Sequence, residues 1–227
     1  MTFYEALLGI EIQDEFGIYE ESDELTPNAD LYVTKVFHLA KEMNIPIEYH
    51  YGASQLCFII PGEDRVIKLP FDGQMEEWED YNEETEEYDI WQESFHNFEI
   101  DYTAKTYDIY TLAVEAGVEE FFADIDILGL NFNNQLIYTQ KYVKPRAEQT
   151  TSKHPSEGSL RIARSLKQEK YIPFESDWIA VCIDMYGEEK FNKLMSFINE
   201  LNLNDFHTNN YGYTKDGKPM LLDYCGY

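Results

Sequence analysis

Three oxygen-bearing side chains near the end of the sequence have the types and spacing to hold a metal ion beside a phosphate group. Asp205 is followed five residues later by Asn210, and Asp223 comes thirteen residues after that, at the end of the apolar pair Leu221-Leu222. Hard cations such as Mg²⁺ take carboxylate and amide oxygens as ligands and are often shared with substrate phosphates. We therefore expect these side chains to converge on one site.

The elements that must position this site are a loop, a hairpin and the helices before them. The Asp-Gly pair in Lys215-Asp216-Gly217-Lys218 predicts a hairpin between strands at 211–213 and 220–223. His207, in the loop, has no partner at a metal-binding spacing, so we interpret it as a brace for the loop. Helical periodicity precedes the loop in three segments, which are 160–171, 178–186 and 188–201.

The first two thirds of the sequence predict a helix, a meander, a second helix and a hairpin. Short runs rich in β-branched and aromatic residues, separated by turn residues, predict the strands. Apolar residues at helical spacing predict the helices, the second of which breaks at Gly117. A polar stretch at 144–158 predicts a linker. The predicted segments are a helix at 31–43, strands at 45–51, 55–60 and 65–69, a helix at 102–122, and strands at 125–130 and 136–143.

The charge of the chain restricts its partners. The 227 residues include 44 acidic and 17 basic side chains, which give a net charge of -27. Such a field repels nucleic acid, anionic lipid and free nucleotide, so ATP would need a metal ion and local basic groups to bind. Three cysteines without a CxxC pair indicate a reducing compartment. The sequence has neither a signal peptide nor a membrane span, and we expect a cytoplasmic protein.

The acidic residues are concentrated in two segments that have no lysine or arginine. One precedes Lys35, and the other runs from Lys68 to Lys105. In the second, acids alternate with tryptophan and tyrosine, a pattern that could imitate phosphates together with a stacking surface. The competing interpretation is a merely soluble acidic face. The expected acidic interaction surface consists of Glu76, Glu77, Glu79, Asp80, Glu83, Glu84, Glu86 and Glu87.

Order and spacing together resemble the protein-kinase-like superfamily, most of all its short bacterial and bacteriophage members and the aminoglycoside and choline kinases. The resemblance rests on Val66-Ile67-Lys68, a helix, a hairpin, a helical region, then Asp205-x-His207-x-x-Asn210 and Leu222-Asp223. It covers about residues 45–227. The resemblance implies an α+β fold of two lobes, in which a five-stranded antiparallel sheet with one helix forms the N-lobe. A shortened, mainly helical C-lobe would end after the metal-binding strand.

The resemblance also implies domain boundaries. Residues 1–44 would be an acidic helical extension, and 45–143 would be the N-lobe with an acidic insert at 72–101. The stretch 144–158 would be the hinge linker, and 159–227 the C-lobe.

The same resemblance assigns roles to individual residues. Lys68 would neutralise the phosphates of ATP, Asp205 would accept the proton of the attacking hydroxyl, and Asn210 and Asp223 would hold Mg²⁺. Gly52 would cover the phosphates, and the backbone of the hinge 139–142, with Gln140 and Tyr142, would contact the adenine. Asp108 is the first choice of acid to pair with Lys68. The alternatives are Glu99 and Glu115.

Departures from the family pattern leave three functions open. Gly52 is the one glycine of the phosphate loop, Leu203 stands where the family has histidine, and the glycine after Asp223 is displaced to Gly226. The chain would be an ATP-dependent phosphotransferase, or a pseudokinase that binds nucleotide without transfer. In the third interpretation it is an acidic DNA mimic on a kinase scaffold, encoded by a phage. This mimic would inhibit a basic host protein, such as a restriction or CRISPR nuclease, in the host cytoplasm.

Overall fold

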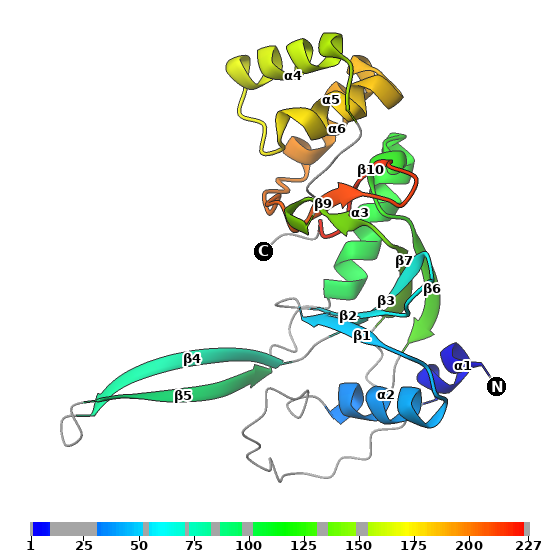
Figure 1. Ribbon diagram of the computed structural model, residues 1–227, viewed down its shortest axis with the longest axis vertical. Helices are drawn as coiled ribbons and strands as arrows, with labels where there is room; N and C mark the ends of the chain where they lie inside the picture. The colour runs from blue at the N-terminus through cyan, green and yellow to red at the C-terminus, as the bar shows by residue number, and fades with distance from the viewer. Residues whose placement is uncertain are drawn as a thin grey trace. The chain divides into compact units, whose positions relative to one another are not determined.

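The computed structural model describes residues 2–9, 31–51, 55–70, 73–82, 87–96, 102–130, 136–148 and 154–224 (Figure 1). The chain is a mixed α+β protein that divides into two compact units. Unit 1 comprises Met1–Gly62, Val66–Ala104 and Ile127–Thr139. Unit 2 comprises Glu63–Arg65, Lys105–Asp126 and Gln140–Tyr227. Each unit is built from three segments, so the chain crosses between the units five times. The domain boundaries expected from the resemblance remain a prediction.

A five-stranded sheet forms the centre of unit 1. Its strand order is β1-β2-β3-β7-β6, and the ends of β3, β6 and β7 continue into unit 2. The pairs β1–β2 and β2–β3 are antiparallel, which confirms the predicted meander. Lys68 lies on β3, the middle strand, opposite Cys57 of β2. The strands are β1 (Glu48–Tyr51), β2 (Gln55–Ile59), β3 (Arg65–Pro70), β6 (Ile125–Leu130) and β7 (Leu136–Lys141).

Two N-terminal helices share the hydrophobic core of this sheet. α1 (Phe3–Leu8) begins with a capping box, in which Thr2 and Glu5 exchange side-chain to backbone hydrogen bonds. α2 (Leu31–Glu42) was predicted from its periodicity. Residues of α1 and α2 thus contribute to the core of unit 1. The core consists of Phe3, Leu7, Val36, Ala40, Phe58, Ile67, Leu69 and Ile137.

The acid-rich segment forms a hairpin that the sequence did not predict. β4 (Gly73–Asn82) and β5 (Glu87–His96) pair antiparallel over ten positions as a two-stranded sheet of their own. The register sets Trp78 opposite Trp91. Aromatic residues are enriched in β-strands and acidic residues are depleted in them. This hairpin forms although its strands contain both. Of the expected acidic surface, Glu83, Glu84 and Glu86 lie outside the described residues, and the other five acids lie on the two strands.

Four helices contribute to unit 2, close to where the periodicity predicted them. α3 (Tyr102–Ala116) begins in unit 1 and ends at Gly117, whose φ of 63° closes the helix. α5 (Ser176–Tyr186) is buried over most of its length and is packed between α4 (Glu157–Glu169) and α6 (Glu188–Glu200). Figure 1 shows α4, α5 and α6 together. Ser156 caps α4, and both it and Ser159 donate their hydroxyls to Asp184 of α5.

A three-stranded sheet in unit 2 carries the end of the chain. Its order is β10-β9-β8, with β8 at Lys144–Pro145, β9 at Tyr211–Tyr213 and β10 at Pro219–Leu221. The hairpin β9–β10 was predicted, whereas β8 lies in the stretch predicted as a linker. A Cβ on Gly212 would be 1.9 Å from the carbonyl oxygen of Lys144, so this close approach requires glycine. The sheet is flanked by two 3-10 helices, η2 (Glu119–Phe121) and η3 (Arg146–Glu148).

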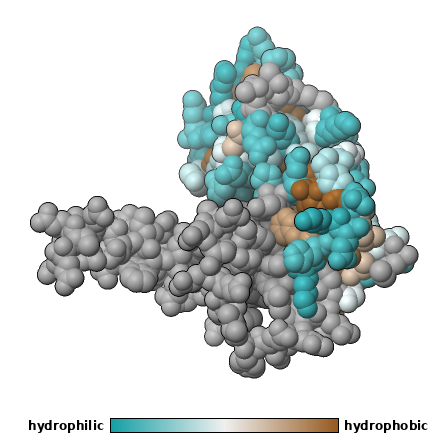
Figure 2. All heavy atoms as spheres, turned by 60° about the horizontal axis from the view of Figure 1, so that its bottom comes forward, coloured by the Kyte–Doolittle hydropathy of each residue, from teal (hydrophilic) through white to brown (hydrophobic). Residues whose placement is uncertain are grey.

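The surface matches the polar composition of the chain. Among the residues coloured in Figure 2, hydrophilic side chains predominate on the face shown and apolar ones occupy small areas. Among the described residues, no helix has the length and apolar content needed to cross a membrane.

Candidate functional site

The loop that carries Asp205 and Asn210 is closed by their own hydrogen bonds. The Nδ2 atom of Asn210 donates to the backbone oxygen of Asp205 at 2.8 Å and to its Oδ2 at 3.1 Å. Asn210 is 6% exposed, so these bonds satisfy a buried amide. No described residue donates to Oδ1 of Asn210. The amide therefore presents its nitrogen to Asp205 and keeps its oxygen for another partner.

Backbone hydrogen bonds join this loop to the residues after β10. The carbonyl oxygen of Asn210 accepts from the amides of Leu222, at 3.0 Å, and Asp223, at 3.4 Å. Asp223 is half-buried at the end of the strand that the apolar pair predicted. The Asn210 side chain is thus joined to Asp205, its backbone is joined to Asp223, and all three residues belong to unit 2. The convergence of the three side chains on one site remains a prediction.

His207 braces the same loop. Its Nδ1 accepts a hydrogen bond from the amide of Asn209 at 3.3 Å, and its carbonyl accepts from the amide of Asn210 at 2.8 Å. Its Nε2 lies 3.6 Å from Oδ1 of Asp205, a distance that is too long for a hydrogen bond. These contacts agree with the expected bracing role.

Arg146 supports the loop from η3 and was missed by the sequence interpretation. Its Nη2 donates to Asp177 at 3.0 Å, and its Nε lies 2.8 Å from a carboxylate oxygen of Glu175. Burial by itself would lower the pKa of Arg146, but the negative charges of Asp177 and Glu175 have the larger combined effect, and the pKa is raised. The next residue, Ala147, donates its amide to the carbonyl of Thr208 at 3.0 Å. Arg146 is a single arginine in the polar stretch 144–158, and no sequence pattern there indicates that it pairs with Glu175 and Asp177.

Aromatic rings pack beneath the loop. Phe206, the residue after Asp205, is 5% exposed and packs against Phe174 with ring centroids 5.1 Å apart. Phe174 also contacts Trp178 and Tyr211, at 4.6 and 5.2 Å between centroids. Burial raises the pKa of Tyr211 to about 12, and its hydroxyl oxygen accepts a hydrogen bond from the backbone amide of Glu175. Phe206 thus anchors the base of the loop while Asp205 stays half-exposed.

Residues 140–142 of the segment expected to contact adenine lie in unit 2 and make polar contacts within it. The amide of Tyr142 donates to the carbonyl of Asp64 at 2.8 Å, and the amide of Lys141 donates to the carbonyl of Asp124 at 3.0 Å. Gln140 is 1% exposed, with Nε2 3.5 Å from the carbonyl of Ala123. An adenine contact through the Tyr142 amide would therefore require its present hydrogen bond to break.

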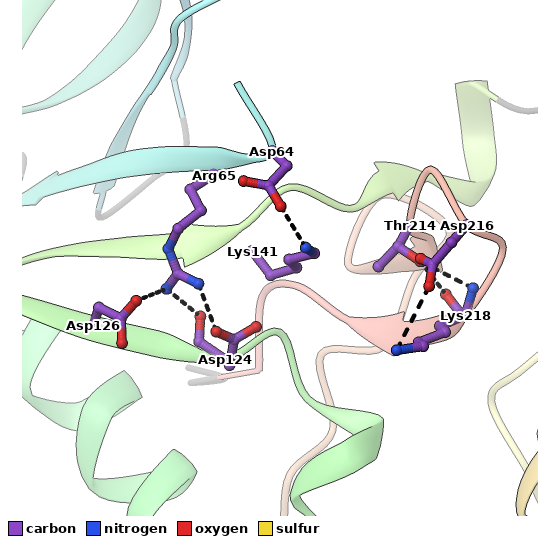
Figure 3. A network of polar contacts seen from close by, with 8 residues as sticks. All are labelled: Asp64, Arg65, Asp124, Asp126, Lys141, Thr214, Asp216 and Lys218. Atoms are coloured by element: carbon purple, nitrogen blue, oxygen red, sulfur yellow. Dashed lines mark hydrogen bonds and ion pairs between the residues drawn. The ribbon is translucent and has the colours of Figure 1, made fainter. Parts of the chain in front are cut away.

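Ion pairs reinforce this segment. Lys141 pairs with Asp64 at 2.7 Å, and Arg65 pairs with Asp124 at 2.5 Å and with Asp126 at 3.1 Å (Figure 3). The neighbouring Lys141 lowers the pKa of the Asp64 carboxyl. Asp64 in the turn before β3, Asp124 just before β6 and Asp126 on β6 are thus paired with basic residues of unit 2.

The remaining expected residues are not brought to this loop by any described contact. Lys68 is buried, with 7% of its surface exposed, on β3 of unit 1. Asp108 and Glu115 are exposed on α3, while Gly52 and Glu99 lie outside the described residues. The pairing of Lys68 with an acid remains a prediction.

The candidate site has the donors that Mg²⁺ prefers, namely two carboxylates and one amide oxygen. In the described part of the chain, no three His, Cys, Asp or Glu side chains cluster as a metal site. A Mg²⁺ shared with phosphate oxygens does not need such a cluster. Among known proteins, no family model matches this chain, and no curated protein matches it.

Proposed function

We propose that this chain is a kinase-like protein that binds ATP with Mg²⁺ and transfers phosphate. The observation that carries the proposal is the orientation of Asn210, whose Nδ2 is committed to Asp205 while Oδ1 accepts no hydrogen bond from the described residues. Asp223 follows β10 and is joined to Asn210 through its backbone amide. In the proposal, the Asp223 carboxylate and the Asn210 amide oxygen bind a cation that also binds phosphate oxygens.

The proposed two-lobed fold is supported by the order of the elements. A five-stranded sheet has Lys68 on its middle strand, and a helix follows the third strand before the last hairpin. A helical region then precedes the loop with Asp205. In the proposal, Lys68 neutralises phosphate charge, and Mg²⁺ supplies the remaining neutralisation against a net charge of -27.

Asp205 is the proposed general base. Its Oδ2 accepts from Asn210, which fixes the carboxylate plane, and its side chain is 29% exposed. A substrate hydroxyl can therefore reach the carboxylate, and geometry is the first requirement for proton abstraction. Asp205→Asn should abolish transfer and preserve ATP binding, because the amide has similar size but does not accept the proton. Transfer at the native rate by this variant would remove Asp205 from the role.

Thermal shift with ATP and Mg²⁺ tests nucleotide binding. At a nucleotide concentration of 100 times Kd, the fold should gain about 2.7 kcal/mol. The gain should shrink in Lys68→Met and Asp223→Asn. Glu200→Gln, a carboxylate-to-amide change at an exposed position at the end of α6, is the matched control and should keep it. No shift in the native chain would refute both the phosphotransferase and the pseudokinase.

A second candidate function is supported by the register of the hairpin β4–β5. Glu76 lies opposite Glu93, and Asp80 opposite Asp89. Like charges at opposed positions destabilise an antiparallel pair, and neither strand contains lysine or arginine. A basic protein surface would relieve this repulsion, as expected of a DNA mimic.

Cleavage of plasmid DNA by a restriction endonuclease tests the mimic. The native chain should inhibit cleavage more strongly at low salt than at high salt, because the attraction is screened. Exchanging Glu76, Glu77 and Glu79 for glutamine should weaken inhibition. The matched control exchanges Glu188, Glu189 and Glu200 of α6, which are exposed in unit 2. Equal loss from both triple variants would contradict a hairpin-specific role.

A further inference from the structure

We propose that Arg146 is a positioning residue for the loop of Asp205 and Asn210. This inference rests on the proposed phosphotransfer function, since it concerns the same site. Arg146 does not contact Asp205 through any described hydrogen bond or ion pair. It would act by holding η3, from which Ala147 binds the loop.

The first step is the anchoring of η3. Arg146 connects to two carboxylates at the start of α5, which are Glu175 at the N-cap and Asp177 in the first turn. Its side chain is 20% exposed, so these ion pairs are partly shielded from solvent. The contact with Asp177 is a hydrogen-bonded ion pair, whereas Nε and the Glu175 oxygen are close in space without forming a hydrogen bond. These two ion pairs link the start of α5 to η3.

The second step runs from η3 to the loop. The amide of Ala147 donates to the carbonyl of Thr208, which lies midway between Asp205 and Asn210. On the other side, the carbonyl of Asn210 receives the amides of Leu222 and Asp223. The loop is thus held at two points by backbone bonds, one of which depends on the position of η3. Release of the Thr208 contact would let Asp205 shift relative to Asp223.

Residues around Arg146 reinforce the same arrangement. Trp178, one residue after Asp177, donates its Nε1 to the carbonyl of Gly212 at 3.0 Å. Gly212 pairs with Pro145, the residue before Arg146. The start of α5 therefore contacts β9, and β9 contacts β8, which leads into η3. Because these contacts are independent of Arg146, its removal should loosen η3 without unfolding the sheet.

The experiment compares Arg146→Met and Arg146→Lys with the control Asp184→Ala. The control removes a carboxylate that receives three hydrogen bonds from Ser156 and Ser159, far along the chain from the loop. Arg146→Met should lower kcat about 10- to 100-fold at unchanged KM for ATP, because small displacements of reacting groups cost that much. Arg146→Lys, which retains one ion pair, should be intermediate. Asp184→Ala should keep the native kcat per folded molecule.

A second readout does not depend on activity. Amide hydrogen exchange of Ala147, whose amide donates to the Thr208 carbonyl, should become at least 10-fold faster in Arg146→Met, and should be unchanged in Asp184→Ala. If the native chain transfers no phosphate but exchange follows this pattern, the proposed function fails and the mechanical link stands. Unchanged exchange and kcat in Arg146→Met would overturn the positioning role. Equal changes of exchange rate and kcat in Arg146→Met and Asp184→Ala would overturn the positioning role, because the effect would then come from a general loss of stability.

Discussion

Gly212→Ala should be among the most destabilising single substitutions in unit 2. The new Cβ would lie 1.9 Å from the carbonyl oxygen of Lys144 and 2.8 Å from its carbonyl carbon, both of which are backbone atoms. Strand β8 would have to move away, which would break its pairing with β9 and strain the bond from Trp178 to the Gly212 carbonyl. Overpacking costs about 1–3 kcal/mol, and a buried group that loses its partner costs about 1–3 kcal/mol more. We expect a total loss of about 2–6 kcal/mol, which is a large part of the stability of a typical domain.

Denaturation in urea, followed by near-UV circular dichroism, measures this loss. Gly158→Ala is the control, because its Cβ would have only the Ser156 hydroxyl nearby, at 3.8 Å, and alanine suits a helix better than glycine. The control should be as stable as the native chain or slightly more stable. A loss below about 1 kcal/mol in Gly212→Ala, less than the range for overpacking alone, would refute the close approach of β8 and β9.

Three further predictions concern the framework of unit 2. Trp178→Phe should lower the free energy of unfolding by about 1–3 kcal/mol in urea denaturation, because the buried Gly212 carbonyl loses its donor; an unchanged midpoint would contradict this bond. Hydrogen bonds from Ser159 and Ser156 lower the pKa of Asp184, so its contribution is complete above the unfolded-state value and is lost as pH falls through the lower folded value. The stability difference between native and Asp184→Ala chains should therefore narrow below about pH 4, and a constant difference would argue against the bonds. Burial raises the pKa of both Tyr186 and Tyr211 to about 12, so spectrophotometric titration should find one tyrosine fewer ionising near that value in Tyr186→Phe than in the native chain.

Most of the framework could be predicted from local patterns. Helical periodicity located α4, α5 and α6 to within a few residues, and the Asp-Gly turn located β9–β10, because these elements depend on neighbours in the chain. The hairpin β4–β5 was missed because its acids hide the strand preference of its tryptophans and tyrosines. β8 was missed because a two-residue strand has no periodicity.

The candidate site was predicted only in part, because sequence patterns report on local spacing and not on tertiary contacts. The spacing of Asp205, Asn210 and Asp223 is local and predicts that their side chains converge. The structure joins the loop to the residues after β10 by backbone bonds, and the convergence of the side chains stays a prediction. The ties of Arg146 to Glu175 and Asp177 span about thirty residues and have no local signature. Likewise, nothing in the sequence showed that the amide of Tyr142 would be used by Asp64. Such contacts depend on tertiary packing.

Calorimetric titration of the native chain with ATP, with and without Mg²⁺, tests the proposed site most directly. We predict saturable binding at one site that requires Mg²⁺ and is lost in Asp223→Asn, because that carboxylate would hold the metal beside the phosphates. The control Glu200→Gln should bind as the native chain does. Absence of binding, or Mg²⁺-independent binding of equal affinity in Asp223→Asn, would contradict the proposal that Asn210 and Asp223 hold a metal-bound nucleotide.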